Sequence, residues 1–354
     1  MHSIAAVFHS SELPLTLEHF PLPNLDHGEA LVRIRCATIC GSDLHTILGR
    51  RKEPTPSILG HEMVGDLIAA NHAKDYYGNS LELGTRIAWS ILWSCTECYF
   101  CRHGLPSRCE RLYKFGHQAL NSQHHSQHHF QHQLSGAFAE HCHLPSGTAI
   151  FGVPDNIPDE VAASANCATA TVAAVIRHAG PLAGQNVLIM GAGMLGLTAC
   201  AMASTAGAAS VVALDPDERR LKLAAQFGAT FTTMDPKPSH GFDIALEFAG
   251  TPQACEQALA ALRPGGHLLL AGSVFPSSPM QLPAELIVRR MLRISGVYNY
   301  QPEDLATALK FLAQTQNRFP FGSLVGQRFP LNEINAAIAF AERERPPRVA
   351  ITPY

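Results

Sequence analysis

The sequence has few charged residues and no excess of basic ones. Among its 354 residues, 26 are Lys or Arg and 29 are Asp or Glu, so 16% are charged and the formal net charge is −3. Proteins that bind nucleic acid neutralise its phosphates with a basic surface, so no nucleic-acid partner is expected. Hydrophobic residues make up 46% of the chain, and its length suits two globular domains better than one hydrophobic core.

The start of the sequence lacks the features of an export signal. Residues 1–20 contain no basic segment followed by a long apolar run, so a reducing, cytoplasmic location is expected. Residues 187–214 carry no charge and are long enough to span a bilayer, but four glycines, the last of them Gly207, interrupt the stretch. A membrane partner is therefore not expected.

Cysteines are scattered except in one short segment. Four of the ten follow the pattern C-x2-C-x2-C-x7-C, namely Cys95, Cys98, Cys101 and Cys109. Disulfides do not persist in a reducing compartment, whereas short C-x2-C spacings let a turn present two thiolates to one zinc ion. The pattern favours a zinc site, and it leaves an iron–sulfur cluster and a run of unligated thiols open as alternatives. Four further cysteines are interpreted as small core residues: Cys36, Cys142, Cys200 and Cys255.

Another motif predicts a dinucleotide-binding unit. Residues 186–190 form a short apolar run, as in a buried parallel strand, and the pattern G-x-G-x-x-G follows. In such a motif the first glycine makes the turn, the second lets the pyrophosphate approach the backbone, and the third packs the helix on the strand. The residues of this turn expected to bind the cofactor are Gly191, Gly193, Met194, Leu195 and Gly196.

The next predicted strand, residues 210–214, ends at Asp215. An acidic residue here accepts hydrogen bonds from the ribose hydroxyls and repels a 2′-phosphate, so NAD is favoured over NADP. Arg219 and Arg220 could flank the adenosine or lie on a solvated helix face. Strands and helices continue to alternate up to residue 298, which predicts a doubly wound parallel α/β sheet.

With these motifs, the sequence resembles the zinc-dependent alcohol dehydrogenases of the medium-chain dehydrogenase/reductase family over essentially its whole length. The segments that carry the resemblance are the cysteine lobe, "CGSDLH" at 40–45, "GHE" at 60–62 and the glycine motif. The resemblance implies a GroES-like, mainly antiparallel β catalytic domain over 1–166 and 299–354, and an NAD-binding Rossmann domain over 167–298. It also implies a structural zinc in the cysteine lobe and a homodimer or homotetramer.

The resemblance further implies a catalytic zinc held by Cys40, His61 and Cys167, with a fourth position for water or an alcohol. Cys167 alone would be a core cysteine, and some branches of the family use a glutamate there. Glu62 is an expected alternative ligand or nearby charge.

Four more roles follow from the resemblance. Asp43 would accept a hydrogen bond from the ligating imidazole, Ser42 would contact the substrate oxygen, and His45 would carry the proton outward. The alternatives are a helix N-cap for Ser42 and Asp43 and a solvent-facing position for His45. Arg348 would contact the cofactor pyrophosphate, or would be a plain surface arginine.

The implied activity is hydride transfer between a small-molecule alcohol and NAD, with zinc stabilising the alkoxide. Arg50 and Arg51 could pair with an anionic substrate, such as a hydroxyalkylphosphonate, because "CGSDLHTILGRR" also resembles the branch associated with phosphonate breakdown; a solvated basic turn is the alternative. Residues 117–133, with six histidines and five glutamines, are interpreted as a low-complexity insert without a role, or as a metal-capturing segment or flap. A catalytically inactive or metal-buffering protein stays the rival function.

Overall fold

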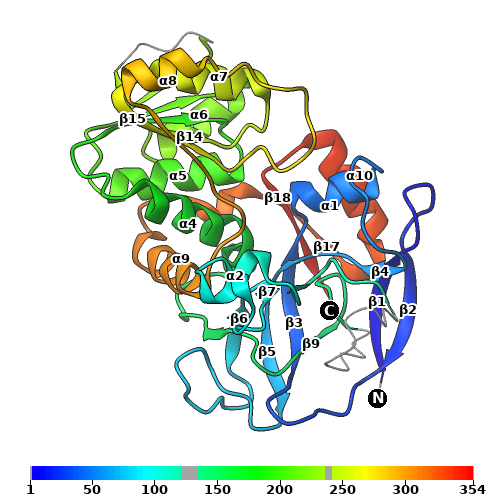
Figure 1. The fold of residues 1–354 in the computed structure, drawn as a ribbon. Coiled ribbons are helices and arrows are strands. Elements are labelled where there is room, and N and C mark those ends of the chain that lie inside the picture. Colours follow the sequence, from blue (N-terminus) through cyan, green and yellow to red (C-terminus); the bar gives the residue numbers. More distant parts are fainter. Residues whose placement is uncertain (1, 121–133, 236–240, 354) are drawn as a thin grey trace. The chain divides into compact units, whose positions relative to one another are not determined.

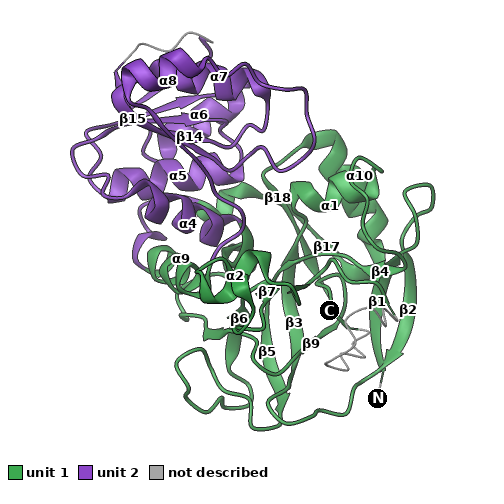
Figure 2. Cartoon of the chain, in the orientation of Figure 1, with its two compact units in different colours: residues 1–167, 301–313, 321–354 green, residues 168–300, 314–320 purple. Residues whose placement is uncertain are grey.

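The structure of the protein is a computed structural model that describes residues 2–120, 134–235 and 241–353. The chain divides into two compact units, which Figure 2 shows in different colours. Unit 1 comprises residues 1–167, 301–313 and 321–354, and unit 2 comprises residues 168–300 and 314–320. The short segment 314–320, which the sequence pattern placed in the catalytic domain, therefore lies in unit 2.

Unit 1 is built mainly from antiparallel strands. Its largest sheet has the order β10-β6-β5-β3-β18-β17, with β9 also paired to β3, and only the β17–β18 pair is parallel. The strands of this sheet are β3 (Ala30–Thr38), β5 (Glu62–Ala70), β6 (Arg86–Trp89), β9 (His141–Leu144), β10 (Ile150–Gly152), β17 (Val325–Pro330) and β18 (Arg348–Thr352). A smaller sheet has the order β2-β1-β4, and a hairpin pairs β7 with β8. These strands are β1 (His2–Phe8), β2 (Thr16–Pro21), β4 (Ser57–Ile58), β7 (Leu92–Trp93) and β8 (Tyr113–Lys114).

The central strands of unit 1 enclose its core and leave short helices at their ends. Large buried side chains from several strands, such as Ile34, Met63, Trp89 and Phe138, pack into one cluster. Helices of this unit are α1 (Gly41–Ile47), α2 (Tyr99–Arg102), α3 (Asp159–Ala163), α9 (Pro302–Thr315) and α10 (Ile334–Glu344). Because β3 runs directly into α1, and the residue before β5 is His61, two expected metal ligands lie at the same edge of the sheet.

Unit 2 is the expected doubly wound sheet. Its six strands are all parallel and have the order β13-β12-β11-β14-β15-β16. Successive strands are added on one side of β11 up to β13 and on its other side from β14 onward, as in dinucleotide-binding folds. The strands are β11 (Asn186–Met190), β12 (Ser210–Leu214), β13 (Phe231–Thr233), β14 (Phe242–Glu247), β15 (Leu262–Leu270) and β16 (Arg293–Gly296). The helices are α4 (Ala170–Ala179), α5 (Met194–Thr205), α6 (Glu218–Gln226), α7 (Pro252–Ala261) and α8 (Ala284–Arg290), with α5 and α7 on opposite faces of the sheet (Figure 1).

The glycine motif forms the turn between β11 and α5. Gly191 has φ of +92°, and a Cβ on Gly196 would lie 1.8 Å from the Gly191 carbonyl oxygen, so only glycine lets α5 pack this closely. The uncharged stretch 187–214 thus folds as β11, α5 and β12. Among the described residues, no helix is both long and apolar enough to cross a membrane.

Candidate active site

Four candidate metal ligands converge in unit 1. Cys40, His61, Glu62 and Cys167 each place a donor atom within 4.8 Å of the others. Two sulfurs and an imidazole are the ligands with which proteins hold a zinc ion while a fourth position stays open. The donor set that the fold brings together therefore fits zinc.

Asp43 joins two of these ligands. The backbone N–H of Cys40 donates to Asp43 Oδ2 at 2.8 Å, which caps the start of α1, and Asp43 Oδ1 lies 3.1 Å from His61 Nδ1. Because Nδ1–H donates to this buried carboxylate, the Nε2 lone pair of His61 is left for a metal. The same carboxylate thus makes both contacts that the sequence offered as alternatives, the helix cap and the bond to the imidazole.

Cys167 lies in a π-helical turn, Ala165–Thr169, between α3 and α4. Such turns are rare and occur often at functional sites. The pKa of the Cys40 thiol lies well below its usual range, first because Cys167 donates a hydrogen bond to it; the charges of Arg348 and His61 also lower it, against the effect of burial. The same hydrogen bond, together with burial, raises the pKa of Cys167. Zinc binds cysteine as the thiolate, so an ion held by both sulfurs displaces any proton that lies between them.

Glu62 is fully buried and is held by a buried arginine. Arg348 Nε lies 2.5 Å from Glu62 Oε2 and Nη2 lies 2.6 Å from Oε1, while the Thr38 hydroxyl donates to Oε2 at 2.6 Å. Arg348 Nη2 also lies 3.7 Å from the Cys40 sulfur. With 5% of its surface exposed, Arg348 is not the plain surface arginine that the sequence left open. Thr38 gave no sequence signal, because its partner lies on the neighbouring strand.

The residues of α1 and the loop after it lie at different depths. Ser42 Oγ is 3.4 Å from His61 Nε2, and His45 is half-buried in the last turn of α1, so it is not the solvent-facing residue considered as its alternative. Arg50 is exposed, whereas the Arg51 guanidinium forms an ion pair with Glu53. The positive charge of Arg51 is therefore already balanced within the protein.

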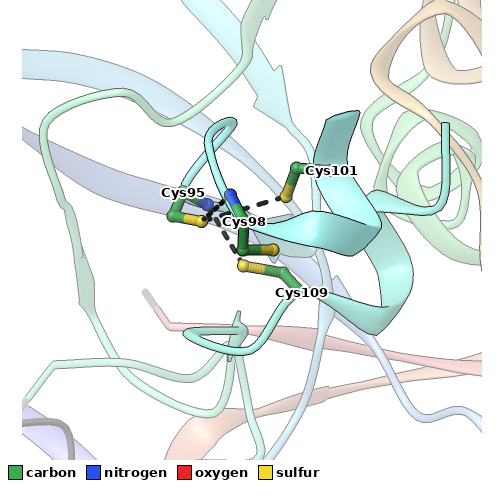
Figure 3. Close-up of side chains that lie close together, drawn as sticks. All are labelled: Cys95, Cys98, Cys101 and Cys109. Carbon is green, nitrogen blue, oxygen red and sulfur yellow. Dashed lines mark hydrogen bonds between the residues drawn. The ribbon is translucent and has the colours of Figure 1, made fainter. Parts of the chain in front are cut away.

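The second set of ligands is the cysteine lobe. Cys95, Cys98, Cys101 and Cys109 place their sulfurs within 4.8 Å of one another beside α2 (Figure 3). The Cys95–Cys101 sulfur distance is 4.0 Å, and all ten cysteines are free, so no disulfide forms here. The backbone N–H groups of Cys95 and Arg111 both donate to the Cys109 sulfur at 3.3 Å, as is favourable for a thiolate. Four sulfurs fill every position of a tetrahedral zinc site, so the lobe fits a structural ion.

His117 is a site residue that the sequence reasoning missed. It was counted in the low-complexity segment 117–133, but it is buried, and its ring centroid lies 5.2 Å from that of His61. His117 is therefore packed within unit 1 beside His61, while residues 121–133 lie outside the described part of the chain. A signal was present, because "FGHQ" at 115–118 repeats the glycine–histidine pair of "LGHE" at 59–62.

In unit 2, Asp215 is buried at the end of β12. Its Oδ2 accepts the Ala192 N–H of the glycine turn at 2.8 Å, and its Oδ1 accepts the Asp217 N–H at 2.8 Å. Arg220 Nη1 lies 3.7 Å from Oδ2, whereas Arg219 is bound by the Asp217 side chain. The carboxylate is thus fixed beside the turn that was expected to bind the pyrophosphate.

Comparisons with known proteins agree with this geometry. Residues 26–155 match the family described as alcohol dehydrogenase GroES-like domain, and residues 195–314 match the family described as zinc-binding dehydrogenase. The chain is 30% identical over 328 residues to L-threonine 3-dehydrogenase of Pectobacterium atrosepticum, which covers 88% of this chain and 84% of that protein.

Solved structures agree as well. An alcohol dehydrogenase from Thermotoga maritima superposes with a TM-score of 0.91 at 27% identity, covering 100% of both chains. Benzyl alcohol dehydrogenase from Acinetobacter calcoaceticus has a TM-score of 0.85 at 25% identity, covering 99% of both.

Proposed function

The chain belongs to the family of zinc-dependent medium-chain alcohol dehydrogenases, and on this premise we propose that Cys40, His61 and Cys167 of unit 1 hold the catalytic zinc while unit 2 binds the nicotinamide cofactor. The protein is an oxidoreductase that transfers a hydride between an alcohol, or the corresponding carbonyl compound, and NAD. The observation that carries the assignment of the ligands is the convergence of their donor atoms within 4.8 Å.

When bound, zinc acts as a Lewis acid on the substrate oxygen, and the nicotinamide accepts or returns the hydride. The chain's own residues prepare the site. Asp43 fixes the tautomer and orientation of the His61 ring, and Arg348 holds the Glu62 carboxylate beside the ligands. Burial raises the pKa of Glu62 to about 7, and the charge of Arg348 opposes this rise. We infer that Arg348 positions Glu62 and Cys40; its contact with the cofactor pyrophosphate stays a prediction.

Ser42 and His45 are suited to move the proton of the alcohol. Ser42 Oγ lies near the metal-facing nitrogen of His61, so its hydroxyl is placed to contact an oxygen bound there. His45 lies one turn further along α1, and burial lowers the pKa of its imidazole. A neutral imidazole accepts a proton, which is what the outer member of such a relay must do.

Cofactor choice rests on Asp215. Its carboxylate, held by two backbone N–H groups, cannot turn away from the nucleotide without losing both bonds. A 2′-phosphate would meet this fixed negative charge, so NAD is preferred over NADP. The glycine turn formed by Gly191, Gly193 and Gly196, with Met194 and Leu195 at the start of α5, is the site proposed for the pyrophosphate.

The substrate is a small alcohol whose identity the relatives do not fix, since their names cover threonine and benzyl alcohol. The Arg51–Glu53 ion pair weakens the hypothesis of a phosphonate-bearing substrate, because a neutral pair attracts an anion less than a lone arginine does. An inactive or metal-buffering role gains no support from the ligands of unit 1, whose surrounding contacts are those of a catalytic centre.

A homodimer or homotetramer is supported by the edge of the unit 2 sheet, which has no partner strand among the described residues. β16 ends the strand order, and the neighbouring Val288 and Met291 are 74% and 71% exposed. Unpaired strand edges and exposed apolar residues favour association. Sedimentation or light scattering of the purified protein measures the mass directly. All ten cysteines are free and six of them lie in the two metal-ligand clusters, which favours a reducing compartment such as the cytoplasm.

The proposed function is tested by a panel of alcohols assayed at 340 nm with NAD and with NADP, together with the zinc content of the same protein. The wild type is expected to oxidise at least one alcohol with NAD, and Cys167→Ser is expected to lose this activity. No turnover of any alcohol by zinc-loaded protein, or full activity of Cys167→Ser, would contradict the proposal.

A further inference from the structure

His117 is placed beside the metal ligands by two glycines that pack against each other. Gly60 and Gly116 both have positive φ, at +85° and +74°, and each is followed by a histidine. A Cβ on Gly116 would lie 2.1 Å from the Gly60 carbonyl oxygen, so only glycine allows this approach. The close contact brings the ring of His117 to 5.2 Å from the ring of His61.

The hydrogen bonds of His117 determine which of its nitrogens carries the proton. Nδ1 lies 3.0 Å from Glu53 Oε1 and 3.3 Å from Arg51 Nη2, and Glu53 and Arg51 are themselves paired. An unprotonated Nδ1 could accept only from Arg51 Nη2, at the longer distance of 3.3 Å, and it would place its lone pair against the nearer Glu53 oxygen, which is repulsive. Nδ1 therefore carries the hydrogen and donates it to Glu53, and in the neutral ring the lone pair lies on Nε2.

That second nitrogen has nothing to bind within the described part of the chain. The side chain is 7% exposed, and Nε2 has no hydrogen-bond partner among the described residues. It is also not one of the four clustered donors around Cys40. A buried acceptor without a partner is unfavourable by about 1–3 kcal/mol, so such a group in a native protein calls for an explanation, and a bound ligand is one.

We infer that His117 determines substrate specificity, with Nε2 accepting a hydrogen bond from a donor group next to the reacting carbinol. The inference rests on the proposed function, and it names the class of substrate: an alcohol that carries a second hydroxyl or an amino group on the adjoining carbon. Glu53 and Arg51 position the ring, since their ion pair holds the Glu53 carboxylate against Nδ1. A site built to bind a donor discriminates strongly against an analogue that lacks it, because the protein acceptor then stays unpaired.

Butane-2,3-diol and butan-2-ol make a matched pair for the test, since both are secondary alcohols and only the first has a donor on the next carbon. The zinc-loaded wild type is expected to prefer the diol by about tenfold in kcat/KM and in calorimetric dissociation constant. His117→Phe keeps a ring but no acceptor, and should lower kcat/KM for butane-2,3-diol about tenfold more than kcat/KM for butan-2-ol, which removes the preference. His117→Gln, whose amide oxygen is an acceptor, should restore part of it.

Three results would overturn the inference: equal affinity of the wild type for both alcohols, an equal loss for both alcohols in His117→Phe, or a ¹⁵N spectrum in which Nε2 of His117 is protonated. An equal loss would mean that His117 only supports His61. The spectrum and the affinities of the wild type do not require either variant to fold. If the wild type oxidises neither of these two alcohols, the full alcohol panel still decides the proposed function, and the calorimetric preference and the spectrum separately decide the role of His117.

Discussion

Breaking the ion pair between Glu62 and Arg348 should destabilise unit 1 strongly. Glu62 has no exposed surface and Arg348 has 5%, and the two are joined by hydrogen bonds of 2.5 and 2.6 Å. In Arg348→Met the carboxylate stays buried with the Thr38 hydroxyl as its remaining described donor. Removing one partner of a buried pair costs about 3–5 kcal/mol, so the free energy of unfolding should fall by about that amount.

Tryptophan fluorescence suits the measurement, because both tryptophans, Trp89 and Trp93, lie in unit 1. Guanidinium unfolding of zinc-loaded protein, followed by this signal, therefore reports the unit that contains the pair. Glu62→Gln and the double variant with Arg348→Met complete a double-mutant cycle. The loss of unfolding free energy in the double variant should be about 2 kcal/mol smaller than the sum of the losses in the two single variants. Additive effects, or a loss below about 1 kcal/mol in Arg348→Met, would refute the reasoning.

Other regions give predictions of the same kind. Asp43→Ala should weaken zinc binding by about 10- to 100-fold, measured by chelator competition, because the His61 ring loses its acceptor; unchanged affinity would count against this. Asp215→Ser should raise the ratio of NADP to NAD turnover, and an unchanged ratio would show that the carboxylate does not discriminate. Burial lowers the pKa of His143 to about 4, so stability should be full above the unfolded pKa of about 6.5 and fall as pH drops towards 4, by up to about 3 kcal/mol. His143→Gln should flatten this part of a pH–stability curve, and a curve with the same slope would contradict it.

Local motifs of the sequence predicted much of this molecule. The glycine turn and the acid that ends the next strand depend on neighbours in the chain, so the parallel sheet of unit 2 was predicted correctly, while its nucleotide site stays a prediction. The four cysteines of the lobe also lie close together in the sequence, within residues 95–109, so their spacing alone predicted that they would cluster. Spacing alone could not show that Cys167 would reach Cys40, since that depends on a π-helical turn.

Contacts between distant segments escaped the sequence altogether. Arg348 and Glu62 meet because β18 and β5 both pair with the end of β3, where Thr38 lies opposite both Ala350 and Glu62. His117 reaches His61 through a backbone contact between two glycines, and its histidine-rich neighbourhood pointed to an insert instead. Such pairs require the register of the sheet, which residue patterns do not encode.

The central claim is that one ion is held by Cys40, His61 and Cys167. Anomalous diffraction from crystals of the zinc-loaded protein, collected at the zinc edge, tests it most directly. One peak is expected at about 2.3 Å from the Cys40 and Cys167 sulfurs and at about 2.0–2.1 Å from His61 Nε2, besides the peak in the cysteine lobe. A peak in the lobe with none at these three residues would contradict the account.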